Sequence, residues 1–117
     1  MADASSPPQA TWNDFAKLDI RVGTIIRVAP FPEARKPAYQ LWIDFGPIGV
    51  KSSSAQITHL YQPETLMGKQ VIAVVNFPPK RIAHFLSECL ILGVIADDQQ
   101  VILLQPERPV ANGLRIG

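Results

Sequence analysis

Residues 71–95 constrain the fold most, because a Pro-Pro pair separates two apolar runs, residues 71–75 and 89–95. Proline fixes φ and donates no backbone hydrogen bond, so Pro78 and Pro79 cannot lie inside a central strand. We therefore predict two buried strands joined by a segment that lies at the rim of a sheet or barrel. Three side chains of this segment are expected at the rim: Phe77, Lys80 and Arg81.

The rest of the chain shows the alternation of apolar and other residues that is typical of strands. Gly23 interrupts the first alternating run and indicates a bulge or a bend there. Residues 55–66 lack alternation and suit short helical turns, with Pro63 at a first helical position. Strands are expected at residues 19–29, 39–45, 48–54, 69–76 and 89–96, with a hairpin return at 101–104.

The N-terminal segment divides into two parts. Residues 1–10 are small and polar, and we expect them to be disordered, with a single folded domain over residues 11–117. Thr11 followed by Asp14 predicts a capped short helix, on which Trp12 and Phe15 share one face. A helix this short is not stable alone, so its aromatic residues must pack on the body of the domain or on a second subunit.

Five main strands with a short helical insertion between the third and fourth predict an all-β OB-fold barrel. Such barrels bind oligonucleotides on strands two and three. The 117 residues suit one domain, and the 47% hydrophobic content favours a large core or one shared across an interface. Because 11 basic and 10 acidic residues nearly cancel, any cationic surface must be local.

Several functions are not supported by any motif. The single cysteine, Cys89, excludes an internal disulfide and is expected to be a packed core thiol. His59 and His84 lack partners at metal spacing, and no nucleophile motif or phosphate loop is present, so we expect no enzyme, metal or cofactor. With no run of about 20 apolar residues and no signal peptide, we expect a cytoplasmic protein without membrane insertion.

Binding is the remaining class of function, and three interpretations stay open. Cations near strand ends resemble sites that follow a phosphate backbone, and aromatic faces suit base stacking. The same apolar rim also suits an extended peptide. Finally, the aromatic residues can be ordinary sheet residues beside a solvated basic turn. The residues concerned are Tyr39, Trp42, Lys51, Phe77, Lys80 and Arg81.

The stretch Asp-Ile-Arg-Val-Gly-Thr-Ile, residues 19–25, resembles the opening of the tRNA-binding domain. That domain also occurs at the C-terminus of many bacterial methionyl-tRNA synthetases and in the endothelial monocyte-activating polypeptide group. Ser87-Glu88 matches the family, whereas Cys89-Leu90 departs from the usual Gly-Met, which weakens the tRNA interpretation. The blocks at 43–46, 51–58, 71–79 and 112–117 are similar to the CsaA group of secretion-related chaperones.

The resemblance implies an OB-fold homodimer that binds unfolded or precursor polypeptides on their way to export. ATP is not expected, a protein-translocation motor is an open further partner, and tRNA binding is a retained or alternative activity. The tRNA-contact positions carried over are Lys51, Ser53, Asn76, Lys80, Arg81, Ser87 and Glu88. The peptide site is expected at Phe77, Pro78, Ile82, Arg35 and Lys36. The dimer interface is expected at Trp12, Phe15, Leu114 and Ile116.

Overall fold

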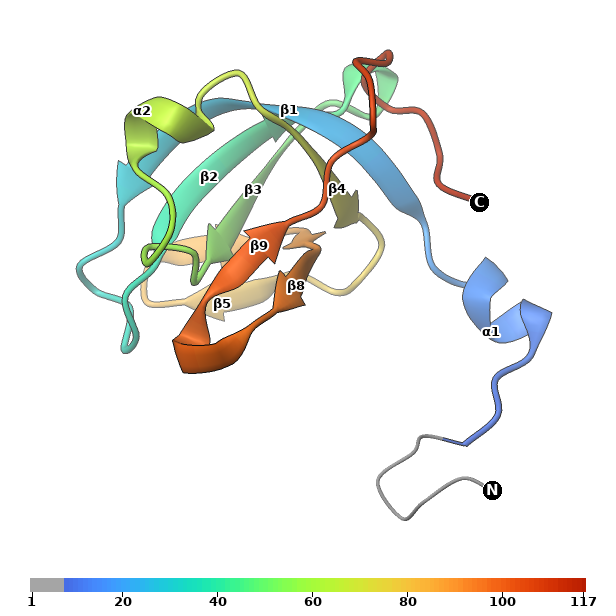
Figure 1. Ribbon diagram of the computed structural model, residues 1–117, viewed down its shortest axis with the longest axis horizontal. Coiled ribbons are helices and arrows are strands. Elements are labelled where there is room, and N and C mark those ends of the chain that lie inside the picture. The colour runs from blue at the N-terminus through green and yellow to red at the C-terminus, as the bar shows by residue number, and fades with distance from the viewer. Residues whose placement is uncertain (1–7) are drawn as a thin grey trace.

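The structure, a computed structural model, describes residues 8–117 and forms a nearly closed antiparallel barrel (Figure 1). The predicted all-β fold class is confirmed. The barrel strands, in the order β3-β2-β1-β4-β7, are β1 (Ile20–Pro30), β2 (Tyr39–Asp44), β3 (Val50–Ala55), β4 (Gln70–Val74) and β7 (Leu90–Ile91). Most of the segment that we expected to be disordered, residues 1–7, lies outside the described residues.

Two hairpins and four short helical segments complete the structure of residues 8–117. One hairpin joins β5 (Lys80–Ile82) to β6 (Phe85–Ser87), and the other joins β8 (Gly93–Ile95) to β9 (Val101–Leu103). The helical segments are α1 (Trp12–Ala16), η1 (Gly46–Ile48), α2 (Pro63–Leu66) and η2 (Asp97–Gln99). The first hairpin was not predicted, because Ala83 makes its turn with φ 53° although no glycine marks it.

The strand β1 pairs with β4 along its first half and with β2 along its second half. The bulge that we expected at Gly23 lies instead between Ile25 and Arg27, where the register shifts. Gly23 serves close packing, since a Cβ there would lie 2.7 Å from the ring of Phe45. The sequence alternation predicts Ile26 on the same face as Ile20 and Val22, with Ile25 on the other face. After the bulge the order is reversed: Ile25 is fully buried and Ile26 is 44% exposed.

The core lies inside the barrel and is closed at one end by α2. Inward residues of β2 follow the predicted alternation, and Pro63 occupies the first turn of α2 as expected. Leu66 on this helix is fully buried, which fixes the helix over the barrel mouth. The most deeply buried apolar side chains are Ile25, Leu41, Ile43, Phe45, Leu66, Val71 and Ala73.

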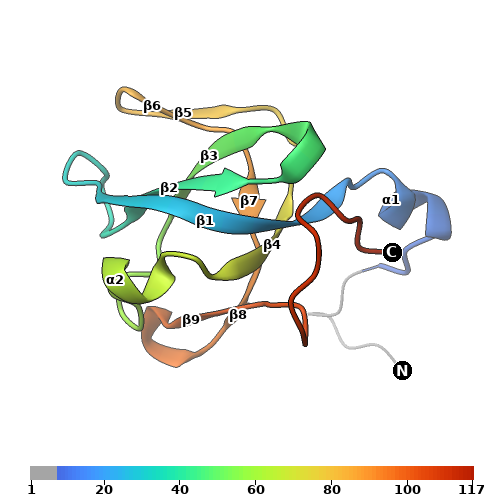
Figure 2. The same cartoon turned by 90° about the horizontal axis from the view of Figure 1, so that it is seen from above.

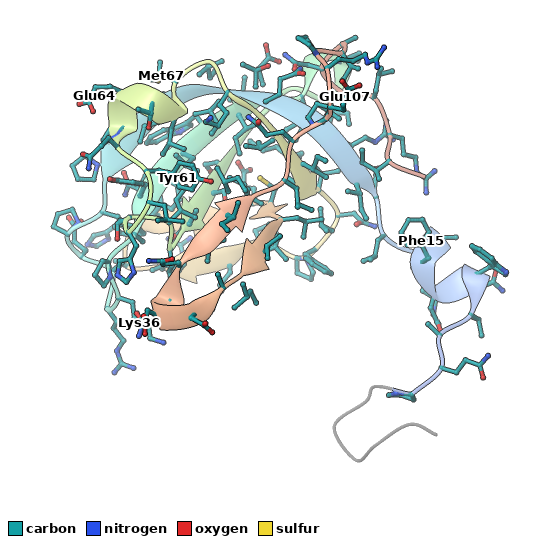
Figure 3. All side chains as sticks on the ribbon, in the orientation of Figure 1. Phe15, Lys36, Tyr61, Glu64, Met67 and Glu107 are labelled. Atoms are coloured by element: carbon teal, nitrogen blue, oxygen red, sulfur yellow. The ribbon has the colours of Figure 1, made fainter. Side chains whose placement is uncertain are left out.

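The helix α1 projects from the barrel and buries none of its residues (Figures 1 and 2). Its capping box forms as predicted: the Thr11 amide donates to Asp14 Oδ2 at 2.9 Å, and the Asp14 amide donates to Thr11 Oγ1 at 3.2 Å. Trp12 is 89% exposed and Phe15 is 44% exposed, so neither aromatic side chain is buried against the body of the domain. Figure 3 shows Phe15 on the projecting helix.

The C-terminal tail runs beside the start of β1, close to α1 (Figure 1). The Val22 amide donates to the carbonyl of Leu114 at 3.0 Å, and the Ile116 amide donates to the carbonyl of Ile20 at 2.8 Å. Leu114 is 52% exposed and Ile116 is half-buried. Among residues 8–117, none of the helices has the length and apolar character needed to cross a membrane.

Candidate binding surface

Asn76 lies two residues after the end of β4 and connects this strand to the segment that precedes β1. Its Oδ1 accepts from the Asp19 amide at 2.8 Å, and its Nδ2 donates to the carbonyl of Lys17 at 2.8 Å. Both polar ends of this side chain therefore stabilise the fold. The backbone leaves the barrel at this point, which places Phe77 and the two prolines at the rim, where they are exposed.

The Ser87-Glu88 pair holds β6 against β3. The Glu88 amide donates to the carbonyl of Ser52 at 2.8 Å, and Glu88 Oε1 accepts from the Ser52 amide at 3.0 Å. Ser87 Oγ accepts from the Ser54 amide at 3.0 Å. Ser53 is only 1% exposed and faces the barrel interior, whereas Lys51 on the same strand is half-buried. The geometry therefore gives Ser53 no access to RNA.

Cys89 follows this pair and is buried, as the sequence predicted for a core thiol. Burial raises the pKa of its thiol from 9.0 to about 12, with a small further rise from Glu88 that the positive charge of Lys51 opposes. The thiol is consequently protonated at neutral pH and is a poor nucleophile. Its role at this position is to form apolar wall.

Phe77 and Pro78 form one wall of a hollow of about 250 Å³, and Cys89 and Leu90 form the other. Phe77 is 44% exposed and Leu90 is 49% exposed, so both present apolar surface to the hollow's mouth. We refer to this hollow as the apolar groove. Its full lining is Phe77, Pro78, Lys80, Ser87, Glu88, Cys89 and Leu90.

A second hollow of about 370 Å³ lies next to the apolar groove, and we refer to it as the cationic hollow. Four of its lining residues are exposed cations, and none of the four forms a salt bridge in the part of the chain that the structure describes. Lys80 lines both hollows. The cations are Arg35, Lys36, Lys80 and Arg81, with Ile82 beside them (Figure 3 labels Lys36).

The two aromatic candidates of β2 have partners within the fold. Trp42 lies between Arg27, whose guanidinium carbon is 4.5 Å from the ring centroid, and Phe85, whose ring centroid is 5.8 Å away. The hydroxyl of Tyr39 donates to the carbonyl of Tyr61 at 2.8 Å. These contacts favour the interpretation of Trp42 and Tyr39 as sheet residues over stacking faces for bases.

The structure thus brings together most residues of the two expected sites. The peptide residues Phe77 and Pro78 share the apolar groove with the RNA residues Ser87 and Glu88. The remaining residues of the expected peptide site share the cationic hollow with Arg81; they are Arg35, Lys36 and Ile82. Lys51, Ser53 and Asn76 line neither hollow. The four expected interface residues lie apart from both, on α1 and the C-terminal tail (Figures 1 and 2).

Residues 20–115 match the model of a family described as "Putative tRNA binding domain". The chain belongs to the tRNA-binding domain family. Among curated relatives, it is 40% identical over 106 residues to the methionine–tRNA ligase of Pyrococcus horikoshii and 35% identical over 109 residues to methionine–tRNA ligase 1 of Sorangium cellulosum. These matches cover 90% and 93% of this chain, which spans only 14% and 15% of those proteins.

Several solved structures match over the whole length of their chains. The chaperone CsaA from Bacillus anthracis is 52% identical, with a TM-score of 0.90, over 94% of this chain and 100% of that one. The CsaA chaperone from Picrophilus torridus is 54% identical, with a TM-score of 0.87, over 93% of this chain and 100% of that one. A protein related to methionyl-tRNA synthetase from Pyrococcus horikoshii is 25% identical, with a TM-score of 0.84, over 95% and 100%. The predicted resemblance to the CsaA-type group of tRNA-binding domains is confirmed.

Sequence reasoning missed part of the surface of this tRNA-binding domain. It did not place Cys89 and Leu90 opposite Phe77, and it did not single out the β8–β9 hairpin, where Val94 is 51% and Ile95 is 86% exposed. A signal for the second feature is present. Residues 93–96 and 101–104 have no polar residue at alternate positions, which indicates apolar side chains on both faces of the hairpin.

Proposed function

We propose that this member of the tRNA-binding domain family is an ATP-independent, cytoplasmic chaperone that binds unfolded or precursor polypeptides for export. It acts without catalysing a reaction. The observation that carries the proposal is the apolar groove at the rim, bordered by cations that form no salt bridge within residues 8–117. The high identity to two solved CsaA chaperones over nearly the whole chain supports it. A protein-translocation motor is a candidate partner that receives the bound polypeptide.

The apolar groove suits a client that has no fixed fold. Phe77, Pro78 and Leu90 offer exposed apolar surface, which gains free energy when any apolar side chain covers it. Such contacts depend little on the order of residues in the client. Lys80 and Glu88 place charges of both signs at the groove, so a polar stretch between apolar client residues also finds partners.

We further propose that the chaperone works as a homodimer joined through α1 and the C-terminal tail. Trp12, Phe15 and Leu114 are exposed apolar side chains near one end of the molecule, and a helix as short as α1 is stable only when packed. A second copy would cover this surface. Two grooves on one dimer would then hold two parts of one long polypeptide, so that the second contact becomes intramolecular.

We propose tRNA as a second ligand, bound at the cationic hollow. Two observations favour it: membership of the family, and four exposed cations that have no salt-bridge partner among the described residues. Lys80 lines both hollows, so the two ligands are expected to compete. Replacing Lys80 and Arg81 together by Gln should lower tRNA affinity and reduce the steepness of its salt dependence by about one per cation lost. Arg108→Gln, in an exposed pair with Glu107, is the matched control.

The proposal is tested by aggregation of a chemically denatured client protein diluted into buffer without ATP. We expect the protein to suppress light scattering in proportion to its dimer concentration, and an excess of unstructured precursor peptide to remove the suppression. Absence of suppression together with absence of peptide binding would contradict the chaperone proposal. If the protein then bound tRNA with an affinity that falls steeply with salt, tRNA binding would be the function that remains.

A further inference from the structure

The outer edge of β7 and β8 has no strand partner within residues 8–117. On the inner edge, the Leu92 amide donates to the carbonyl of Ile72, the Leu104 amide donates to the carbonyl of Leu92, and the Ala96 amide donates to the carbonyl of Gln100. Backbone groups of successive residues in a strand point to opposite edges. The amides and carbonyls of Ile91, Gly93 and Ile95 therefore point to the outer edge.

This edge faces a trough between the two walls of the unclosed barrel. Contact between β3 and β6 ends at the Ser54 amide, which donates to Ser87 Oγ at 3.0 Å. Beyond it the walls enclose about 360 Å³, with residues 54–57 on one side and residues 90–93 and Ile95 on the other. Val101 and Leu103 also line the trough. A neighbouring hollow shares Ile95 and Val101, so the trough continues past the end of β8.

The surface of the trough edge is apolar and unprotected. Folded proteins usually protect a free strand edge with charges, proline or a covering segment, because an exposed edge pairs with other chains. Residues 90–96 contain no charge and no proline, and Ile95 is 86% exposed. Leu90 lines both this trough and the apolar groove, so one continuous apolar path leads from Phe77 to Ile95.

We propose that the client polypeptide adds to the outer edge of β8 as an extended strand lying in this trough; the inference rests on the proposed polypeptide binding. The unpaired amides and carbonyls of Gly93 and Ile95 bind the client's backbone, which every sequence offers. Alternate client side chains point into the apolar trough and select for hydrophobic residues. An extended client segment is the occupant that this edge fits, because the apolar lining of the trough continues through Leu90 into the apolar groove.

The test compares two changes at one position. Ile95→Pro removes the amide that points to the outer edge, whereas Ile95→Ala removes the side chain and keeps that amide. The β8–β9 pairing stays intact in both, because Val94 and Ile102 carry its hydrogen bonds. We expect Ile95→Pro to bind an unstructured apolar peptide about tenfold more weakly than Ile95→Ala, with equal melting temperatures.

A second measurement uses the unaltered protein and needs no variant to fold. Single backbone amides of the peptide are replaced in turn by esters, which removes one donor at a time. Strand addition predicts a loss of affinity at every second position. Peptide binding with a flat ester profile, or with equal affinity for both Ile95 variants, would overturn the inference while leaving the chaperone proposal standing. Ile95 variants that change the oligomeric mass but not peptide affinity would assign the edge to self-association and overturn it too.

Discussion

Truncating Phe77 should weaken polypeptide capture without loosening the fold. Phe77 is 44% exposed and lies on a rim segment outside every strand, so Phe77→Ala removes little of the core. A phenylalanine side chain offers about 200 Å² and burial contributes about 25 cal/mol per Å², so complete coverage of its exposed part by a client is worth about 2 kcal/mol. Affinity should therefore fall by about 30-fold at most, and by about fivefold if half of that surface is covered.

The assay is fluorescence anisotropy of a labelled, unstructured precursor peptide titrated with the wild-type and variant proteins. Ile26→Ala is the matched control, because Ile26 is also 44% exposed but lies on β1 and lines neither hollow. We expect the control to bind the peptide like the wild type, and urea unfolding midpoints of all three proteins to be similar. Equal peptide affinity of Phe77→Ala and wild type would refute the assignment of the apolar groove.

Three further predictions concern the body of the molecule. Gly23→Ala should lower the free energy of unfolding by about 1–3 kcal/mol, because its Cβ would lie 2.7 Å from the ring of Phe45; an unchanged urea midpoint would contradict the packing described. The pKa of the Cys89 thiol is raised from 9.0 to about 12, so the protonated thiol stabilises the fold fully below pH 9. This contribution is lost as the pH rises from 9 towards 12, by up to about 1.4 kcal/mol per pH unit. Cys89→Ala should flatten this alkaline slope, and identical slopes would disprove it. Trp12→Ser should halve the mass measured by light scattering, and a persistent dimer would place the interface elsewhere.

Much of the barrel could be predicted because local patterns and tertiary packing agree. The alternation in β2, the capping box of α1 and the position of Pro63 each depend on neighbouring residues only. The position of the bulge in β1 could not be predicted, because the adjacent isoleucines Ile25 and Ile26 satisfy an alternating pattern in either register. The structure selects Ile25 for the core because the strand changes partners just before it.

The part of the candidate site that could be predicted is the part whose backbone conformation is restricted by proline. The two prolines place Phe77 and Lys80 at the rim whatever the rest of the chain does. The opposing wall, Cys89 and Leu90, could not be placed, because it depends on the register in which the end of β4 pairs with the start of β7. The burial of Ser53 could not be predicted either, because three consecutive serines do not show which side chain points into the barrel.

The most direct test of polypeptide binding is one anisotropy titration of the purified protein against an unstructured precursor peptide and against bulk tRNA, each at two salt concentrations. Light scattering on the same sample gives its mass. We predict a dimer whose peptide affinity changes little with salt, because apolar contact dominates. Its tRNA affinity should be weaker and should fall as the salt concentration rises. Tight, salt-sensitive tRNA binding with no peptide signal would contradict it.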